Sequence, residues 1–269
     1  MELMKLPEYV YKYISWEKDY HRKIVLENKI FFSSVKNFND PFDSTIPLRY
    51  DKWTDEQIFD LFVQEIRRNN PNLTDDEVKR VARNELRNDD VRNDKRIQNT
   101  IDNQREIIAT KYGIFSTSCK YDSVLMWSHY SNLHKGLCIR FNCEKLRDYI
   151  ENECPKNDWI IVWYKAEYSK DYPVLNPFEL SDEDQIIKSL IIKSAIWIYE
   201  EEIRFILFTY PNKELTLPYG IIDQIILGCK ICREDKKELI EFSKNNNIEL
   251  VQAFRKEYDF DLGFIKVNV

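Results

Sequence analysis

KSAIWIYEEEIRFILF occupies residues 193–208 and joins an apolar stretch to three consecutive acids and then to a second apolar stretch. The spacing of the apolar residues over 182–199 predicts an amphipathic helix that Ser181 caps. The β-branched and aromatic content of residues 203–208 predicts a strand directly after it. A helix, an acidic junction and an apolar strand in succession are typical of a protein that mixes helices with sheet.

Segments with the same strand-like content recur on both sides of this stretch. They lie at residues 9–15, 29–34, 113–118, 136–141, 158–164, 221–227 and 248–254. Helical spacing occurs between them, at residues 17–28, 123–130, 144–150 and 234–244. This order predicts a mixed α/β (α+β) fold with mostly antiparallel, small sheets, two in number, and flanking helices.

Residues 51–110 have a different character, because they contain no glycine and carry alternating charges with apolar residues at helical spacing. Thr54 and Thr74 are each followed by acids, which is typical of helix N-caps. We therefore interpret residues 51–110 as a helical insertion within a single domain that spans residues 1–269.

The composition disfavours several classes of protein. The chain has 269 residues, 43% hydrophobic and 14% aromatic, so a core and a cleft lined by rings are expected. A net charge of −6 disfavours broad binding to duplex nucleic acid. The five glycines are too far apart for a Rossmann or P-loop phosphate cradle.

The location is expected to be cytoplasmic, because the start of the chain lacks the pattern of a secretory signal. No apolar run reaches the roughly 20 residues of a membrane span, so no contact with a membrane is expected. The six cysteines are expected to be free thiols, and the lone CxxC at residues 229–232 has no second pair that would complete a zinc site. No bound metal is expected.

The acidic run provides the candidate catalytic residues. Because side chains alternate along an extended chain, Glu200 and Glu202 are expected on one side and Glu201 on the other. One carboxylate can stabilise a cationic sugar, and the other can orient or deprotonate a nucleophile. The alternative is a solvated acidic junction that Arg204 neutralises.

Two further segments can line a pocket. Ser116 and Ser118 lie at alternate positions of a predicted strand. Rings and imidazoles follow at Trp127, His129, Tyr130 and His134, where rings can stack on a base and imidazoles can donate hydrogen bonds to phosphate or ribose. The alternative is that these histidines pack and cap a turn.

A set of motifs resembles a family of bacterial proteins known only as a domain of unknown function. The motifs are YKY at 11–13, FFSS at 31–34, FNDPFD at 38–43, GIFSTS at 113–118, MWSHY at 126–130, HKGLCIRF at 134–141, KSAIWIYEEEIRF at 193–205 and IDQIILGCKI at 222–231. Residues 51–110 fall outside the resemblance.

A second resemblance is to ADP-ribosyltransferases of the Arg–Ser–Glu type, which carry their motifs on three strands in the same order. Lys12 or Tyr13 stands where that family has Arg or His, and Ser116 or Ser118 and then the two glutamates follow. The resemblance implies NAD as substrate, with Glu202 facing the ribosyl cation and Glu200 orienting the acceptor. The residues implied to bind NAD are Lys12, Tyr13, Ser116, Ser118, Trp127, His129, Tyr130, His134 and Arg204.

The implied partner is an acceptor macromolecule, either a protein or a nucleic acid. Such an activity suits a toxin or a phage-defence effector, and an inhibitory partner is compatible with it. Two other functions are also open. One is a metal-dependent hydrolase or nuclease built on Asp40, Asp43, His129 and His134. The other is a non-enzymatic interaction module whose insertion contacts a partner.

Overall fold

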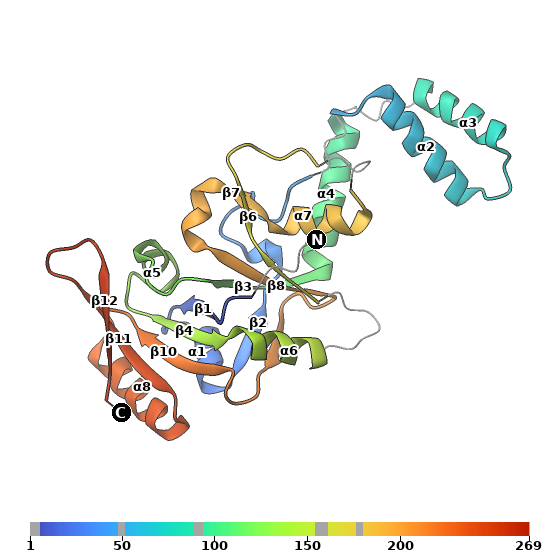
Figure 1. Ribbon diagram of the computed structural model, residues 1–269. Helices are drawn as coiled ribbons and strands as arrows, with labels where there is room; N and C mark the ends of the chain where they lie inside the picture. The colour runs from blue at the N-terminus through green and yellow to red at the C-terminus, as the bar shows by residue number, and fades with distance from the viewer. Residues whose placement is uncertain (1–5, 48–51, 89–93, 154–160, 176–179, 269) are drawn as a thin grey trace.

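A mixed eight-stranded sheet forms the centre of the computed structural model, which describes residues 6–47, 52–88, 94–153, 161–175 and 180–268 (Figure 1). The strands run in the order β12-β11-β10-β4-β1-β3-β8-β5. Neighbours are antiparallel except β10 and β11, which are parallel across helix α8 (Arg233–Asn246). The predicted mixed and mostly antiparallel arrangement is confirmed. The strands are β1 (Tyr9–Ile14), β3 (Tyr112–Ser118), β4 (Leu137–Asn142), β5 (Ile161–Lys165), β8 (Glu202–Phe208), β10 (Ile222–Leu227), β11 (Glu249–Arg255) and β12 (Leu262–Lys266).

The prediction of two small sheets is wrong, because these eight strands form one sheet. The sheet is nevertheless weakly paired at one place, between β1 and β3. Strand β1 pairs with β4 along its whole length, and β3 pairs with β8 along its whole length. Between β1 and β3 the register contains one pair, Tyr11 with Ser118. The sheet thus opens between a five-stranded and a three-stranded part. Two separate two-stranded ribbons join β2 (Lys29–Phe32) to β9 (Lys213–Thr216) and β6 (Glu167–Ser169) to β7 (Ile192–Ser194).

Alternation along β1 sends its side chains to two different cores. Val10 and Ile14 belong to a large apolar cluster that also contains residues of α1 (Asp19–Leu26), α6 (Cys143–Glu153) and α8. Tyr11 and Tyr13 lie on the other face, where they pack with Trp127 of α5 (Val124–Tyr130). Complete burial of one large apolar side chain contributes about 1.5–3 kcal/mol, so both faces stabilise the sheet.

The helical character predicted for residues 51–110 is confirmed for its described parts, 52–88 and 94–110. Thr54 caps α2 with a complete capping box, and Thr74 accepts a hydrogen bond from the backbone of Glu77 in α3. Figure 1 shows α2 and α3 as a hairpin that projects from the rest of the molecule. The third helix returns to the body, where Ile108 and Ala109 are buried. The helices are α2 (Asp55–Asn69), α3 (Asp75–Asn88) and α4 (Asp94–Lys111).

The helix predicted over 182–199 is correct only in its first half. The predicted cap Ser181 is confirmed, but the helix it caps, α7 (Asp182–Ile191), ends at Ile191. The chain continues as β7 and then as the 3-10 helix η3 (Ala195–Glu200). Pairing of β7 with β6 and the burial of Lys193 among carboxylates override the helical spacing. The strands β6, β9 and β12 were not predicted.

Within the described parts of the chain, none of the helices combines the length and the apolar character that a membrane crossing requires. Five cysteines lie in these parts, and all five are free thiols. Cys232 accepts a hydrogen bond from the backbone of Asp235 at the N-terminus of α8. Cys154 lies outside the described residues.

Gly136 fills a position where the chain has no room for a side chain. A Cβ atom added there would lie 2.0 Å from the carbonyl oxygen of Ile14 and 3.0 Å from that of Ser131. Both contacts are with backbone, which cannot move without disturbing the junction of β1 and β4. We expect Gly136→Ala to lower the free energy of unfolding by about 1–3 kcal/mol, measured by urea denaturation. Gly220→Ala provides the comparison. Open space surrounds that glycine, so a substitution there adds backbone strain, because of its φ of +85°, but no clash. A Gly136→Ala variant as stable as the wild type would contradict this packing.

Candidate active site

A pocket of about 610 Å³ opens where β1 and β3 separate. Residues 11–13 of β1 and residues 114–118 of β3 line it. Glu200 and Glu202 also line it, together with Lys193. Its volume falls within the range of about 300–1,000 Å³ that is usual for small-molecule sites.

The two glutamates reach the pocket through a local geometry that differs from the predicted extended chain. Glu200 ends η3, Glu201 adopts the left-handed conformation with φ of 40°, and Glu202 begins β8. Glu200 and Glu202 are nevertheless buried side by side, whereas the side chain of Glu201 is 34% exposed and forms an ion pair with Lys120. The predicted separation of Glu201 from its neighbours is correct, but a turn produces it rather than strand alternation.

Backbone hydrogen bonds fix this turn against the neighbouring strand. Ser118 Oγ donates to the carbonyl oxygen of Glu200 at 2.6 Å, and the backbone N–H of Glu202 donates to Tyr168 Oη at 2.9 Å. The backbone N–H of Cys119 donates to the carbonyl oxygen of Glu201 at 3.0 Å. The position of both carboxylates is therefore set by β3 and β6, not by the acidic run alone.

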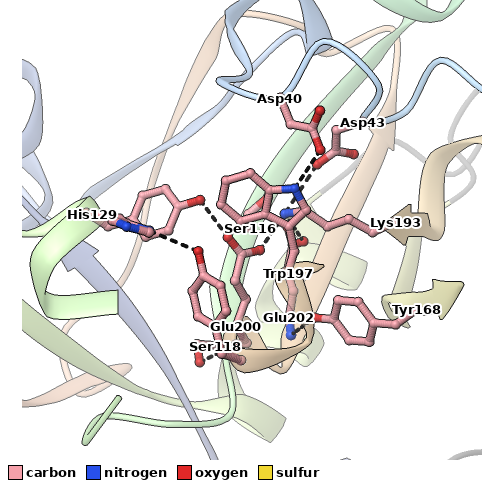
Figure 2. A network of polar contacts seen from close by, with 12 residues as sticks. Asp40, Asp43, Ser116, Ser118, His129, Tyr168, Lys193, Trp197, Glu200 and Glu202 are labelled. Carbon is pink, nitrogen blue, oxygen red and sulfur yellow. Dashed lines mark hydrogen bonds and ion pairs between the residues drawn. The ribbon is translucent and has the colours of Figure 1, made fainter. Parts of the chain in front are cut away.

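Lys193 binds three buried carboxylates at once (Figure 2). Its Nζ donates to Glu200 Oε2, lies 3.2 Å from Glu202 Oε2 and lies 3.3 Å from Asp43 Oδ2. The ring of Trp197 lies 5.1 Å from the same ammonium. Such a buried cation is tolerated only when opposite charges surround it.

Arg204 forms the floor of this network, and its side chain is completely buried. Its Nη1 and Nη2 donate to the two oxygens of Asp43, both at 2.7 Å, which is the bidentate geometry of strong ion pairs. Its Nε and Nη2 donate to the two oxygens of Glu202 at 3.0 and 2.8 Å. Nη1 also donates to Ser44 Oγ and to the carbonyl oxygen of Leu190. Two cations and three carboxylates thus form one buried network, and four of these five residues line the pocket.

The network moves the pKa values of the two glutamates in opposite directions. Burial raises the pKa of Glu200 above its ordinary value, and the charge of Lys193 opposes that effect only in part. Burial also acts on Glu202, but Arg204 and Lys193 outweigh it and lower its pKa to about 2. Divergent pKa values in neighbouring carboxyl groups are typical of acid–base sites in which one group stays ionised and the other exchanges protons.

Residues 126–205 match the model of a family described as a protein of unknown function (DUF2971). The predicted resemblance to a domain of unknown function is confirmed for this segment, which covers 80 of the 269 residues. No curated protein and no solved structure matched the chain in the same comparisons. The DUF2971 segment contains Tyr130, Lys193, both glutamates and Arg204, so it contributes most of the buried network.

Five of the predicted NAD-binding residues line the pocket, two from β1, two from β3 and one from the DUF2971 segment. Tyr130 Oη donates to Glu200 Oε1 at 2.5 Å, and burial together with Glu200 raises the pKa of that phenol. Lys12 Nζ donates to the carbonyl oxygen of Ser116 at 2.6 Å. The five residues are Lys12, Tyr13, Ser116, Ser118 and Tyr130.

Four other predicted residues lie outside the pocket lining. Trp127 is completely buried, and its Nε1 donates to the carbonyl oxygen of Tyr121 at 2.8 Å. His134 stacks on Trp127 and bonds Ser128, and burial lowers its pKa. His129 contacts Tyr199, and Arg204 is completely buried against Asp43 and Glu202. Trp127 and His134 therefore support the wall behind Tyr13 instead of facing the cavity.

The residues considered for a metal site do not gather, because each carboxylate binds a different partner. Asp43 binds Arg204, and Asp40 accepts a hydrogen bond from Trp197 Nε1 at 2.7 Å. Figure 2 shows His129 on the opposite side of Trp197 from Asp40 and Asp43. Among the residues that the structure describes, no three or more His, Cys, Asp or Glu side chains gather in a way that could hold a metal ion.

Lys193 and Asp43 were not predicted to act together with the glutamates. The sequence did contain a signal for Lys193, because it lies within a strongly apolar stretch and such a lysine must find an anion if it is buried. Asp43 lies in a loop about 150 residues before Lys193 in the sequence, so no local pattern predicts that the two side chains meet.

Lys12 is the least compensated cation of the site. Burial lowers its pKa to about 8, and the charges of Glu202 and Glu200 offset only part of that effect. The folded state therefore binds this proton less tightly than the unfolded chain, so stability is lower below pH 8 and recovers as the pH rises from 8 toward the ordinary lysine value. We expect Lys12→Met to raise the free energy of unfolding at pH 7 by about 1–3 kcal/mol.

Urea denaturation of wild type and Lys12→Met at pH 7 and pH 9.5 measures this effect. The difference between the two proteins should shrink at the higher pH, because Lys12 is then neutral in the folded wild type. A variant that is less stable than the wild type at pH 7 would show that the ammonium is well compensated.

Proposed function

We propose that this pocket is the active site of an NAD-dependent, ADP-ribosyltransferase-like enzyme. The reaction breaks the bond between nicotinamide and ribose and passes ADP-ribose to an acceptor. The observation that carries the proposal is the pair of buried glutamates with opposite pKa shifts, placed in a pocket where the sheet opens.

The position of the pocket supports this proposal. NAD-consuming transferases that lack a glycine-rich cradle hold the dinucleotide in a split between strands, as expected from the resemblance noted above. Here β1 and β3 meet at Tyr11 and Ser118, and the pocket lies beside that junction. Tyr20, Phe31 and Phe38 add aromatic surface to its walls, which suits the flat rings of a dinucleotide.

The two glutamates have distinct roles in the proposed reaction. The bond between C1 of the ribose and the nicotinamide nitrogen breaks, and both electrons leave with nicotinamide, which becomes neutral. Glu202, which stays ionised, stabilises the positive charge that develops on the ribose. An acceptor oxygen or nitrogen then bonds to C1, and Glu200 takes up the proton that the acceptor loses.

The remaining pocket residues position the substrate. Ser116 and Ser118 form a polar wall beside Glu202, and Tyr13 and Tyr130 offer rings that can clamp nicotinamide or adenine. Lys12 takes the place of the first-motif Arg or His and can donate a hydrogen bond to the substrate. No metal is required for this chemistry. The acceptor is a protein or a nucleic acid, and a toxin or phage-defence role under the control of an inhibitory partner fits such an activity.

Incubation with NAD tests the proposal directly. Purified protein receives NAD labelled in nicotinamide or, in parallel, in the adenylate part, with and without cell extract. We expect release of free nicotinamide and transfer of the adenylate label to a macromolecule in the extract. Absence of nicotinamide release under both conditions would contradict the assignment.

The projecting hairpin favours a second candidate, an interaction module. Helices α2 and α3 have their own small core, and Figure 1 shows them standing away from the sheet that carries the glutamates. If binding were the function, deletion of residues 52–88 would abolish the cellular effect of the protein, whereas substitution of both glutamates would leave it intact.

A further inference from the structure

Lys12 differs in its surroundings from Lys193, which lines the same pocket. Its Nζ donates one hydrogen bond, to the carbonyl oxygen of Ser116, and lies 5.2 Å from the centre of the Phe115 ring. In the described part of the chain, no carboxylate oxygen lies within ion-pair distance of this nitrogen. Lys193, by contrast, contacts three carboxylates.

The Lys12 side chain is enclosed by protein but remains accessible from the pocket. It lies on β1 between Val10 and Ile14, which are completely buried in the main core. Lys12 itself is only partly buried, and it lines the same pocket as Glu200 and Glu202. A molecule in the pocket can therefore approach the amine, whereas bulk water solvates it poorly.

We propose that Lys12 is a nucleophilic amine and that the pocket forms an imine with a compound that carries an aldehyde or a ketone. An amine becomes a nucleophile at neutral pH when an apolar surrounding without a paired anion favours its uncharged form. At Lys12 no carboxylate of the described residues is paired with the amine, and Phe115 adds apolar surface beside it. This activity goes beyond the cleavage of NAD and does not depend on it.

The electrostatics of the pocket support the amine form. Because burial lowers the pKa of Lys12 to about 8, a substantial fraction of the side chain is neutral near neutral pH. Roughly a quarter is neutral at pH 7.5 for a pKa of 8, compared with about one in a thousand for an ordinary lysine.

The proposed step is balanced in atoms and electrons. The lone pair of Nζ bonds to the carbonyl carbon, and the electron pair of the C=O bond moves to the oxygen, which takes up a proton. The nitrogen loses its protons as water leaves, and a C=N bond forms. The Glu200 carboxyl, with its raised pKa, can supply and accept these protons, since it lines the same pocket.

The size and walls of the pocket limit the carbonyl compound. About 610 Å³ accommodates a small molecule with a ring. Tyr20, Phe31 and Phe38 form an aromatic part of the wall, so a carbonyl group attached to an aromatic or apolar body fits better than a strongly charged one.

Reductive labelling tests this inference. The full-length protein is incubated with benzaldehyde and cyanoborohydride, which converts an imine to a stable secondary amine, and each lysine is followed by peptide mass spectrometry. We expect Lys12 to be labelled about 10-fold faster at pH 7.5 than exposed lysines such as Lys237 and Lys244, given the gain in neutral amine. Its rate should level off above pH 8.

Two controls keep the test independent of folding and of NAD chemistry. Lys193 serves as an internal comparison in the wild type, because its three carboxylates should keep it unlabelled. Lys12→Arg should remove the fast label and leave the exposed lysines unchanged. If neither benzaldehyde nor the smaller acetaldehyde labels Lys12 faster than the exposed lysines, the inference is overturned. Loss of NAD turnover alone would not affect it.

Discussion

Replacing Arg204 by methionine is expected to lower the free energy of unfolding by about 3–5 kcal/mol, which is a large part of the stability of a domain of this size. Arg204 is completely buried and donates to both oxygens of Asp43 and both oxygens of Glu202. Methionine fills part of the volume but leaves two buried carboxylates with Lys193 as their remaining cation. Urea denaturation at pH 7 measures the loss.

Arg140→Met is the matched control. Arg140 lies on the same sheet, its side chain is 20% exposed, and it pairs with Asp223 at 2.7 Å. Ion pairs that water reaches contribute about 1 kcal/mol or less, so this substitution should have a small effect. Equal losses in the two variants would show that the buried network contributes no more than a surface pair.

The pH dependence of the same proteins gives an independent check. The folded-state pKa of Glu202 is lowered to about 2, chiefly because Arg204 and Lys193 outweigh the effect of burial. Glu202 therefore contributes stability above its ordinary pKa, and this contribution is lost as the pH falls toward 2. The difference in free energy of unfolding between wild type and Arg204→Met should become smaller over that acid range.

The strands around the site could be predicted from the sequence, because their residues are β-branched or aromatic and end at turn-forming residues. β1, β3, β4 and β10 lie within about two residues of their predicted positions, an uncertainty that is usual for element ends. β9 and β12 were missed, since β9 carries two charges in four residues and β12 has one buried position. Short, exposed strands lack the periodicity on which such predictions depend.

The ion network could not be predicted, because it depends on tertiary contacts. Ile191 and Ile192 continue the helical spacing of α7, yet the chain leaves the helix there so that Lys193 can reach the carboxylates. The pairing of Asp43 with Arg204 likewise requires the loop after η1 (Val35–Asn37) to lie against β8. The glutamate pair was predicted correctly, although a left-handed residue, Glu201, produces its geometry.

Glu200→Gln is expected to lower the transfer of ADP-ribose to an acceptor by about 10²–10⁴-fold, the usual contribution of a general base. Glutamine keeps the size of the side chain and can still accept a hydrogen bond from Tyr130, but it cannot take up a proton. Burial raises the pKa of Glu200, so its negative charge is less favourable in the folded state than that of Glu202. The Glu200→Gln variant should therefore fold. Glu202→Gln is a poorer test, since it also removes one of the two carboxylates that pair with Arg204.

Two comparisons identify the proton-accepting role of Glu200. Glu201→Gln removes an equal charge from the next residue, which is 34% exposed and pairs with Lys120, so its transfer rate should stay within about twofold of the wild type.

Transfer by the wild type should rise with pH as the Glu200 carboxyl loses its proton, at a pH above the ordinary pKa of glutamate. That rise should be absent from Glu200→Gln. Nicotinamide release into water should fall less than transfer, because Glu202 still faces the ribose. If Glu201→Gln loses as much transfer as Glu200→Gln, the effect is one of local charge, and the assignment of Glu200 as the base must be abandoned.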